Sequence, residues 1–289
     1  MRNVRQRHAF FNDNHIRQFA DAAASITQEL RQQFQRLLAT ERAVLASDVV
    51  ALHDLRVSIR RLRVLLRALE SPLAQTTATA LEHRWQKFSD DLSPLRDADV
   101  WRGMLRALPG VTPAFLRQAM ALLKKNRAHP GRLLRSHTWA RLKRDTQFLL
   151  DKSLPVALAK PGKLTRPTPA LRRCWKDCVA RAAKRAGHPR WKELERAHKL
   201  RIACRRARYL AEFFAAASAG KKDRRLWEQT ARRYRAAQSA LGQTHDADVL
   251  LEFLLNSTLP PPAPHTAEHP KRRTAGLAKF GRVWKKMRK

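Results

Sequence analysis

Residues 53–67 constrain the fold more strongly than any other stretch of this 289-residue chain. They contain no glycine or proline, and their apolar residues recur at helical spacing, which predicts an α-helix. At about 100° per residue, the apolar side chains here and just outside gather on an arc roughly 100° wide, enough to seat the helix on a core. These apolar residues are Leu52, Leu55, Ile59, Leu62, Leu66 and Leu69.

Basic side chains lie beside this apolar arc. At helical spacing they fall within about 80° of one another, and they are His53, Arg56, Arg60, Arg63 and Arg67. Like charges three or four residues apart on a helix repel one another by a few tenths of a kcal/mol per pair. A helix that accumulates such pairs on one flank is therefore expected to bind an anion.

The same pattern occurs a second time. His198, Arg201, Arg205, Arg206 and Arg208 match His53, Arg56, Arg60, Arg61 and Arg63 at an offset of 198 − 53 = 145. Each copy is followed by an Asp box, which we define as residues 96–100 (Arg-Asp-Ala-Asp-Val) and 245–249 (His-Asp-Ala-Asp-Val), at an offset of 246 − 97 = 149. Two motifs in the same order at nearly the same offset predict two copies of one helical unit.

Together, the duplicated motifs resemble those of the CHAD domain family, named for a conserved histidine α-helical domain. The resemblance extends from about residue 13 to the end of the chain. It implies an all-α fold in which two pseudo-symmetric helical bundles, produced by an internal duplication, line a basic central channel. It also implies binding of inorganic polyphosphate, by a protein that resides in the cytoplasm, on polyphosphate granules.

The resemblance implies polyphosphate contacts in both copies. The first row consists of His53, Arg56, Arg60, Arg61, Arg63 and Arg67. The second row consists of His198, Lys199, Arg201, Arg205, Arg206 and Arg208. The second copy departs from the first, because Glu212 stands opposite Arg67 and His245 opposite Arg96. The second row is therefore expected to be the weaker one.

The charge of the chain agrees with an anionic partner. Sixty Lys and Arg residues against 24 Asp and Glu residues give a formal net charge of +36, and such self-repulsion destabilises a compact state. Arginine suits phosphate because its planar fork donates two parallel hydrogen bonds and stays charged. Non-specific nucleic-acid binding is the alternative, since this charge attracts any polyanion at low salt. Against it, the rows lack interleaved aromatic residues for base stacking, and no base-recognition module is visible.

Sequence motifs typical of enzymes are weak in this chain, which predicts a binding protein with no catalytic residues, metal or cofactor. His53-Asp54 spells the metal-binding dipeptide of HD-type phosphohydrolases, but Lys199 stands where the second copy would need the aspartate. Gly220-Lys221 lacks the Ser or Thr that a P-loop requires next. The aspartates of both Asp boxes are expected near helix starts, where they would cap backbone amides and hold nearby arginines.

Prolines divide the chain into two halves. Residues 1–152 form the predicted first half, residues 153–169 a proline-containing linker, and residues 170–289 the second half with a basic C-terminal segment. In the second half, one helix is predicted to end at Gly242 and a short one to start at the Asp box. The segment from residue 269 onward is either a packed helix or a disordered basic tail.

The three cysteines, Cys174, Cys178 and Cys204, are odd in number and lie in predicted helices, which suits a reducing cytosol. Cys174 and Cys178 are spaced to share a metal, but a buried-core role is favoured because no further ligand is evident. No apolar run reaches the length of a membrane span. The protein is therefore expected to be cytoplasmic and to have no membrane partner.

Overall fold

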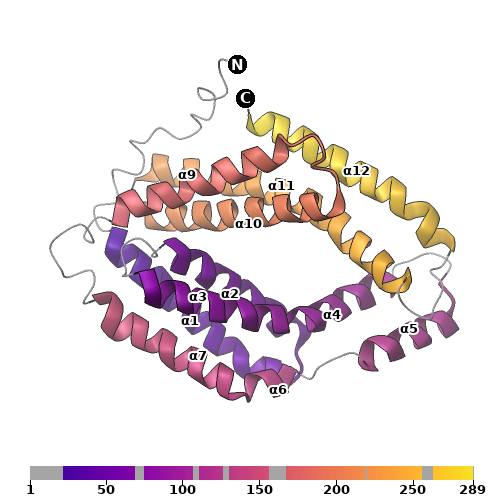
Figure 1. Cartoon of the computed structure of the whole chain (residues 1–289), viewed down its shortest axis with the longest axis horizontal. Coiled ribbons are helices and arrows are strands. Elements are labelled where there is room, and N and C mark those ends of the chain that lie inside the picture. Colours follow the sequence, from indigo (N-terminus) through magenta and orange to yellow (C-terminus); the bar gives the residue numbers. More distant parts are fainter. Residues whose placement is uncertain are drawn as a thin grey trace. The chain divides into compact units, whose positions relative to one another are not determined.

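The computed structural model describes residues 22–68, 75–106, 111–125, 130–155, 167–218, 220–255 and 263–288. Most of these residues are helical and none lies in a strand, which confirms the all-α fold class (Figure 1). The chain divides into two compact units: the first unit is Asp21–Leu171 and the second unit is Arg172–Lys289. The pseudo-symmetry and the central channel concern both units together and stay predictions.

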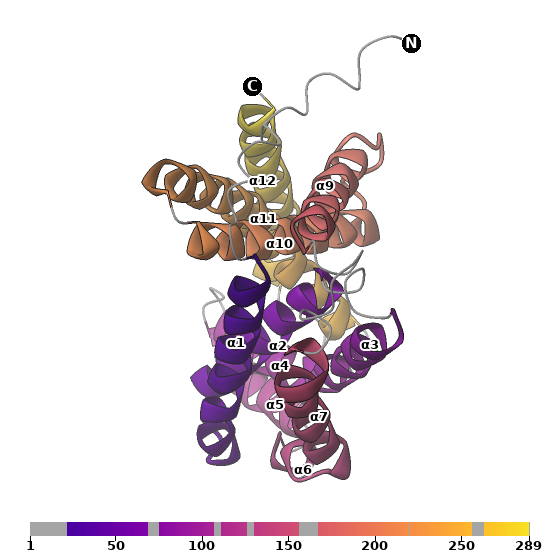
Figure 2. The same ribbon diagram turned by 90° about the vertical axis from the view of Figure 1, so that its left-hand side faces the viewer.

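The first unit is built from one long helical hairpin and the shorter helices that cover it (Figure 2). Its helices are α1 (Ala22–Leu45), α2 (Val49–Ala68), α3 (Gln75–Asp91), α4 (Ser93–Arg106), α5 (Pro113–Lys125), α6 (Pro130–Leu134) and α7 (His137–Phe148), followed by the π-helical turn η2 (Leu149–Ser153). Within this unit α1 packs most extensively on α2, and α2 packs on α3.

Helix α2 buries the apolar arc that its sequence predicts. Leu52, Leu55, Ile59, Leu62 and Leu66 are all buried, whereas Leu69 lies outside the described residues. The start of the helix is capped, because the Asp48 carboxylate accepts hydrogen bonds from the Val50 amide (2.7 Å) and the Ala51 amide (3.1 Å). The helix that carries the first row is thus fixed at its start and along its buried face.

An aromatic core lies beneath α3 and α7. Trp85 meets the Trp139 ring edge to face at 5.8 Å between centroids, and Phe88 stacks on Trp139 at 5.1 Å. The Trp85 indole N–H donates to the Thr146 hydroxyl at 3.0 Å, so its polar edge is satisfied inside the core. This core holds α3 in place against α7.

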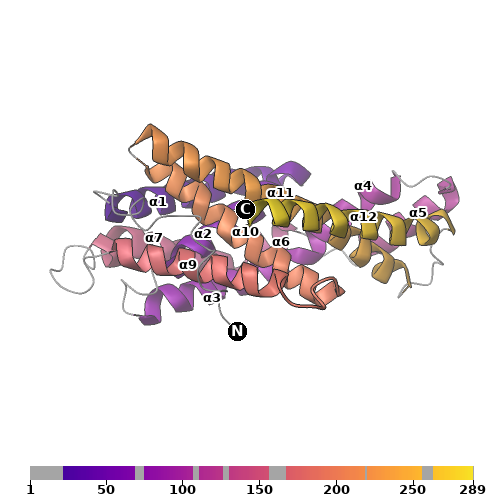
Figure 3. The same ribbon diagram turned by 90° about the horizontal axis from the view of Figure 1, so that it is seen from above.

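The second unit consists of α9 (Pro167–Ala186), α10 (Leu194–Ala217), α11 (Lys221–Leu255) and α12 (Ala263–Met287). Helix α10 packs against α11 most extensively, and α12 lies along the C-terminal part of α11 (Figure 3). The core is aromatic here as well: Trp175 meets Phe214, Trp227 and Tyr234 edge to face.

The predicted linker is partly helical at both ends. Ser153 is the last residue of η2, and residues 154–155 continue the helical backbone. Pro167 and Pro169 lie in the first turn of α9. The first turn of a helix tolerates proline because its amides have no partner within the helix. Residues 156–166, which include the rest of the predicted linker, lie outside the described residues.

For the second half, the structure corrects one expectation and decides between the two alternatives left open for the C-terminal segment. Gly242 does not end a helix, because α11 runs unbroken from Lys221 to Leu255 through the Asp box. The basic C-terminal segment is a packed helix rather than a disordered tail: in α12, Leu277 and Phe280 are buried, and Phe280 contacts the Trp191 ring at 5.0 Å. A Cβ on Gly276 would lie only 2.2 Å from the Thr244 hydroxyl, so this glycine allows α12 to approach α11 closely.

Candidate anion-binding site

The side chains of the first row, on α2, are buried to different extents. His53 is exposed at the start of the row, and Arg60 and Arg61 are half-buried further along. Arg56 is buried, and its guanidinium donates to the Ser89 carbonyl at 3.2 Å and to the Ser93 hydroxyl at 3.3 Å. Arg56 therefore ties α2 to the junction of α3 and α4, which gives it a packing role that its place in the row does not reveal.

The far end of the first row is organised by one buried carboxylate. Glu82 on α3, whose side chain is 1% exposed, lies 2.8 Å from Arg63 Nε and 2.8 Å from Arg67 Nη2. Arg63 Nη2 also donates to the Gln86 side chain at 2.9 Å. Two guanidiniums share one carboxylate, so this cluster of three retains one net positive charge in a fixed orientation.

The second row lies on α10 and ends in a comparable cluster. The Glu212 carboxylate lies 3.3 Å from Arg208 Nε and 2.9 Å from Arg235 Nη2, and Arg235 comes from α11. Glu212 was expected to weaken the second row because it replaces an arginine. Arg235 offsets this charge, so the second cluster also contains two guanidiniums and one carboxylate.

The structure divides the second row between two faces of α10. On one face, Arg201 lies beside α11, where its Nη2 is 4.0 Å from the Asp246 carboxylate. On the other face, Lys199 pairs with Glu195, and the Lys199 carbonyl accepts a hydrogen bond from Arg185 of α9 at 2.9 Å.

Arg206 also lies on the side of α10 that faces α9. There its positive charge helps to lower the pKa of the Cys178 thiol, whose main stabilising contact is the hydrogen bond from Cys174. Lys199 and Arg206 are thus separated from His198, Arg201 and Arg205, and the predicted contacts of the second unit form two groups.

A residue outside both predicted rows joins the α11-facing group. The His245 ring from α11 lies against the His198 ring from α10, with 4.2 Å between centroids and 46° between planes. Burial lowers the pKa of His198, and Arg201 and Arg205 lower it further. Burial likewise lowers the pKa of His245, to about 3, with His198, Arg201 and Arg205 contributing. The sequence marked His245 only as a departure from Arg96, and its position in the Asp box was the available signal.

The aspartates of the second Asp box connect helices. Asp248 is buried and lies 2.8 Å from His269 Nε2 and 3.2 Å from Arg273 Nε, both on α12. Arg273 also donates to the Lys192 carbonyl. The expectation that these aspartates hold cationic side chains agrees with this geometry. The expectation of helix capping is wrong for this copy, because α11 continues through it. The side chains of Asp97 and Asp99 lie outside the described residues.

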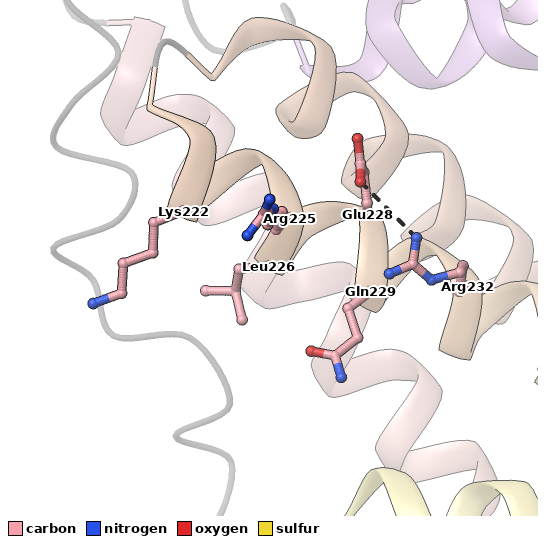
Figure 4. Close-up of a pocket in the computed structure, with 6 residues that line it drawn as sticks. All are labelled: Lys222, Arg225, Leu226, Glu228, Gln229 and Arg232. Atoms are coloured by element: carbon pink, nitrogen blue, oxygen red, sulfur yellow. Dashed lines mark ion pairs between the residues drawn. The ribbon is translucent and has the colours of Figure 1, made fainter.

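Other features of the described residues lie apart from the rows. The residues searched contain no group of three or more His, Cys, Asp or Glu side chains that could hold a metal ion. A surface cavity of about 700 Å³ lies on the N-terminal part of α11 (Figure 4). Its lining residues follow one face of the helix and are Lys222, Arg225, Leu226, Glu228, Gln229 and Arg232. No residue of either row lines this cavity.

The protein is thus all-helical, with a basic row on a packed helix in each unit. The chain belongs to the CHAD domain family, because the family model described as the CHAD domain matches residues 28–268. None of the described helices is both long and apolar enough to cross a membrane.

Two solved structures share the fold. The CHAD domain from the plant Ricinus communis superposes with a TM-score of 0.65 at 24% identity, covering 91% of this chain and 85% of that one. PptA from Streptomyces chartreusis superposes with a TM-score of 0.65 at 18% identity, covering 91% of this chain and 99% of that one. The search of curated proteins found no match.

Proposed function

We propose that this chain binds inorganic polyphosphate through the first row on α2 and the second row on α10. The observation that carries the proposal is the arrangement of guanidiniums in rows on packed helices, with a shared carboxylate orienting the end of each row. Membership of the CHAD domain family supports the same ligand class.

The shape of the rows favours a linear polymer of phosphates over one small anion. Residues 53–67 extend about 21 Å along the helix axis at 1.5 Å per residue, so one row can follow several phosphates. Glu82 and Glu212 hold their arginines in defined orientations, which reduces the side-chain entropy lost when a phosphate binds. Charge-assisted hydrogen bonds from guanidinium forks then provide the contacts.

In this proposal the chain is a binding or targeting protein of the cytoplasm that associates with polyphosphate granules. It is not an enzyme, and the polymer leaves the complex with its length unchanged. Polyphosphate lengths on a gel before and after incubation with the protein test this point. Shortened or extended chains would replace the binding role with a catalytic one.

A competition titration tests the ligand class. Fluorescently labelled duplex DNA is bound first and then displaced by long-chain polyphosphate or unlabelled DNA, with phosphate equivalents matched at one ionic strength near physiological. Polyphosphate is expected to displace the label at clearly lower concentration, because the rows hold closely spaced cations that a chain of phosphates can follow. The Lys285→Ala/Lys286→Ala variant of α12 controls for general basicity and should keep this preference. Equal displacement by the two polymers would reduce binding to non-specific attraction of polyanions.

A further inference from the structure

We propose that His198 and His245 together form a phosphate subsite of the second unit that binds protons along with the ligand. This inference rests on the proposed polyphosphate binding and deepens it. It adds His245 to the site and makes the affinity of one unit depend on pH.

Contact between the two rings is the geometric basis of the subsite. The imidazoles come from different helices, α10 and α11, and their centroids are 4.2 Å apart. Both Nδ1 atoms are buried and have no hydrogen-bond partner in the structure. A proton on Nδ1 would lack an acceptor there, so each neutral ring carries its proton on Nε2, the nitrogen that remains to donate to a ligand.

Burial, together with the charges around the pair, favours the neutral form of both rings in the unliganded protein. Two imidazolium ions at this distance would repel each other, and the guanidiniums of Arg201 and Arg205 on α10 add to that repulsion. The lowered pKa values of His198 and His245 agree with this environment. The charged and titratable groups on the elements around the pair are Arg201 and Arg205 of α10, Asp246 and Asp248 of α11, His269 and Arg273 of α12, and Arg185 of α9.

These surroundings select an anion over a metal ion. A divalent cation would meet the same repulsion from Arg201 and Arg205 that adds to burial in disfavouring protonation of the rings. A phosphate reverses the situation, because its negative charge opposes the field of the arginines and favours the charged form of each imidazole. Phosphate binding therefore raises the pKa of both histidines and draws protons from solution.

The sign of the pH dependence follows from this linkage. The pKa of each histidine is higher in the complex than in the free protein, so affinity increases as pH falls through the pKa of the complex. Each proton taken up contributes at most about a tenfold increase in affinity per pH unit. Above the pKa of the complex no proton is taken up, and the affinity no longer changes with pH through these rings.

Calorimetry of the full-length chain tests the subsite. Long-chain polyphosphate is titrated near pH 6, where imidazoles commonly titrate, in two buffers of different ionisation enthalpy. The difference in heat between the buffers gives the protons taken up. The unaltered protein should take up protons and bind several-fold more tightly at about pH 5.5 than at about pH 7.5, a range in which imidazoles change charge. His245→Gln should lose most of both effects, and His198→Gln provides a second, independent variant.

The matched control is His137→Gln, which changes an exposed histidine of α7 in the first unit. It should leave the proton uptake associated with His245 in place. A further variant, His245→Arg, introduces the residue that the first Asp box has at the matching position. Its charge does not change with pH in this range, so its affinity for polyphosphate should depend less on pH.

If unaltered protein and His245→Gln take up the same number of protons while binding polyphosphate, the inference is overturned and the proposed function stands. If the unaltered protein does not bind polyphosphate at all, the proposed function fails and the inference fails with it.

Discussion

Each unit has a cluster of two guanidiniums and one carboxylate at the end of its row, but the carboxylate lies on a different helix relative to the row in each unit. In the first unit, the carboxylate of Glu82 comes from α3 and is shared by two arginines of the row on α2. In the second unit, Glu212 lies on α10, the helix that carries the row, and one of its two arginines, Arg235, comes from the neighbouring helix α11. The ratio of two guanidiniums to one carboxylate is the same in both.

The sequence offsets show how this exchange is distributed. At the offset of 145, Glu212 stands where the first copy has Arg67; at the offset of 149, Arg235 stands where it has Gln86. A comparison of single positions therefore shows only a charge reversal within the row. The compensating arginine is visible only when the residues of the partner helix are included.

The two clusters differ in their exposure to solvent. The Glu82 side chain is 1% exposed, whereas that of Glu212 is 19% exposed and that of its partner Arg235 is 59% exposed. A buried charge depends on its partners because water cannot replace them, whereas a solvated pair is screened. The first cluster should therefore contribute more to stability than the second.

The largest expected effect tests this difference directly. Glu82→Gln should lower the free energy of unfolding by roughly 3 kcal/mol or more, because it leaves two half-buried guanidiniums without their shared charge partner. Glu212→Gln should cost about 1 kcal/mol or less, since solvent screens the second cluster. Urea denaturation followed by circular dichroism measures both.

Glu195→Gln is the matched control, because it removes an exposed carboxylate that pairs with Lys199 on the same helix. It should leave the unfolding midpoint close to that of the unaltered protein. Equal losses for Glu82→Gln and Glu212→Gln would show that exposure does not distinguish the clusters.

A smaller effect is expected on ligand binding, where the equal charge balance predicts equal rows. Arg60→Ala and Arg205→Ala, which occupy matching positions, should each weaken binding of long-chain polyphosphate by roughly tenfold or more, as expected for a charge-assisted contact. Both should weaken binding of tripolyphosphate less, because the short ligand cannot gain from engagement of two units on one chain. Titration of each variant with both ligands at one ionic strength provides the comparison.

The Lys285→Ala/Lys286→Ala variant is again the control and should change affinity less than either row variant. A larger loss for this variant would move the site to α12. A loss that is the same for short and long chains would show that the two units bind independently.

Much of the fold could be predicted because it depends on local patterns. The apolar spacing around residues 53–67 predicted both the α2 helix and its buried face. Gly242 was misjudged because glycine is a weak helix former when only local preference is considered. In the structure, Arg201 of α10 packs against that position, a tertiary contact that no local pattern reveals.

The candidate site was less predictable because its details depend on neighbouring helices. Spacing on a helical wheel placed Arg56 with the other cations, but contact with the α3–α4 junction buries it. The contact between His198 and His245 joins residues 47 positions apart, at 245 − 198. Such partners follow from how α10 and α11 pack, which the sequence motif does not specify.

The smallest effect concerns the residue that each unit places beside its first arginine. Ser93 and Gly242 match at the offset of 149. The Ser93 hydroxyl accepts hydrogen bonds from Arg56, whereas Gly242 leaves room for Arg201, since a Cβ there would lie 3.3 Å from Arg201 Nε. Ser93→Ala should lower stability by about 1 kcal/mol or less, because one neutral acceptor is lost while the Ser89 carbonyl remains.

Gly242→Ala should act in the opposite direction on stability. Alanine is favoured over glycine within a helix by up to about 1 kcal/mol. The three atoms nearest to the added methyl group belong to the Arg201 guanidinium, which can shift by a few tenths of an ångström. The variant should therefore be slightly more stable in urea yet bind polyphosphate a few-fold more weakly, because the shifted guanidinium no longer meets the ligand as before. Ser93→Ala should not show this opposition of stability and affinity. If Gly242→Ala is stabilised and binds polyphosphate unchanged, Arg201 is a packing residue of the second unit, as Arg56 is of the first.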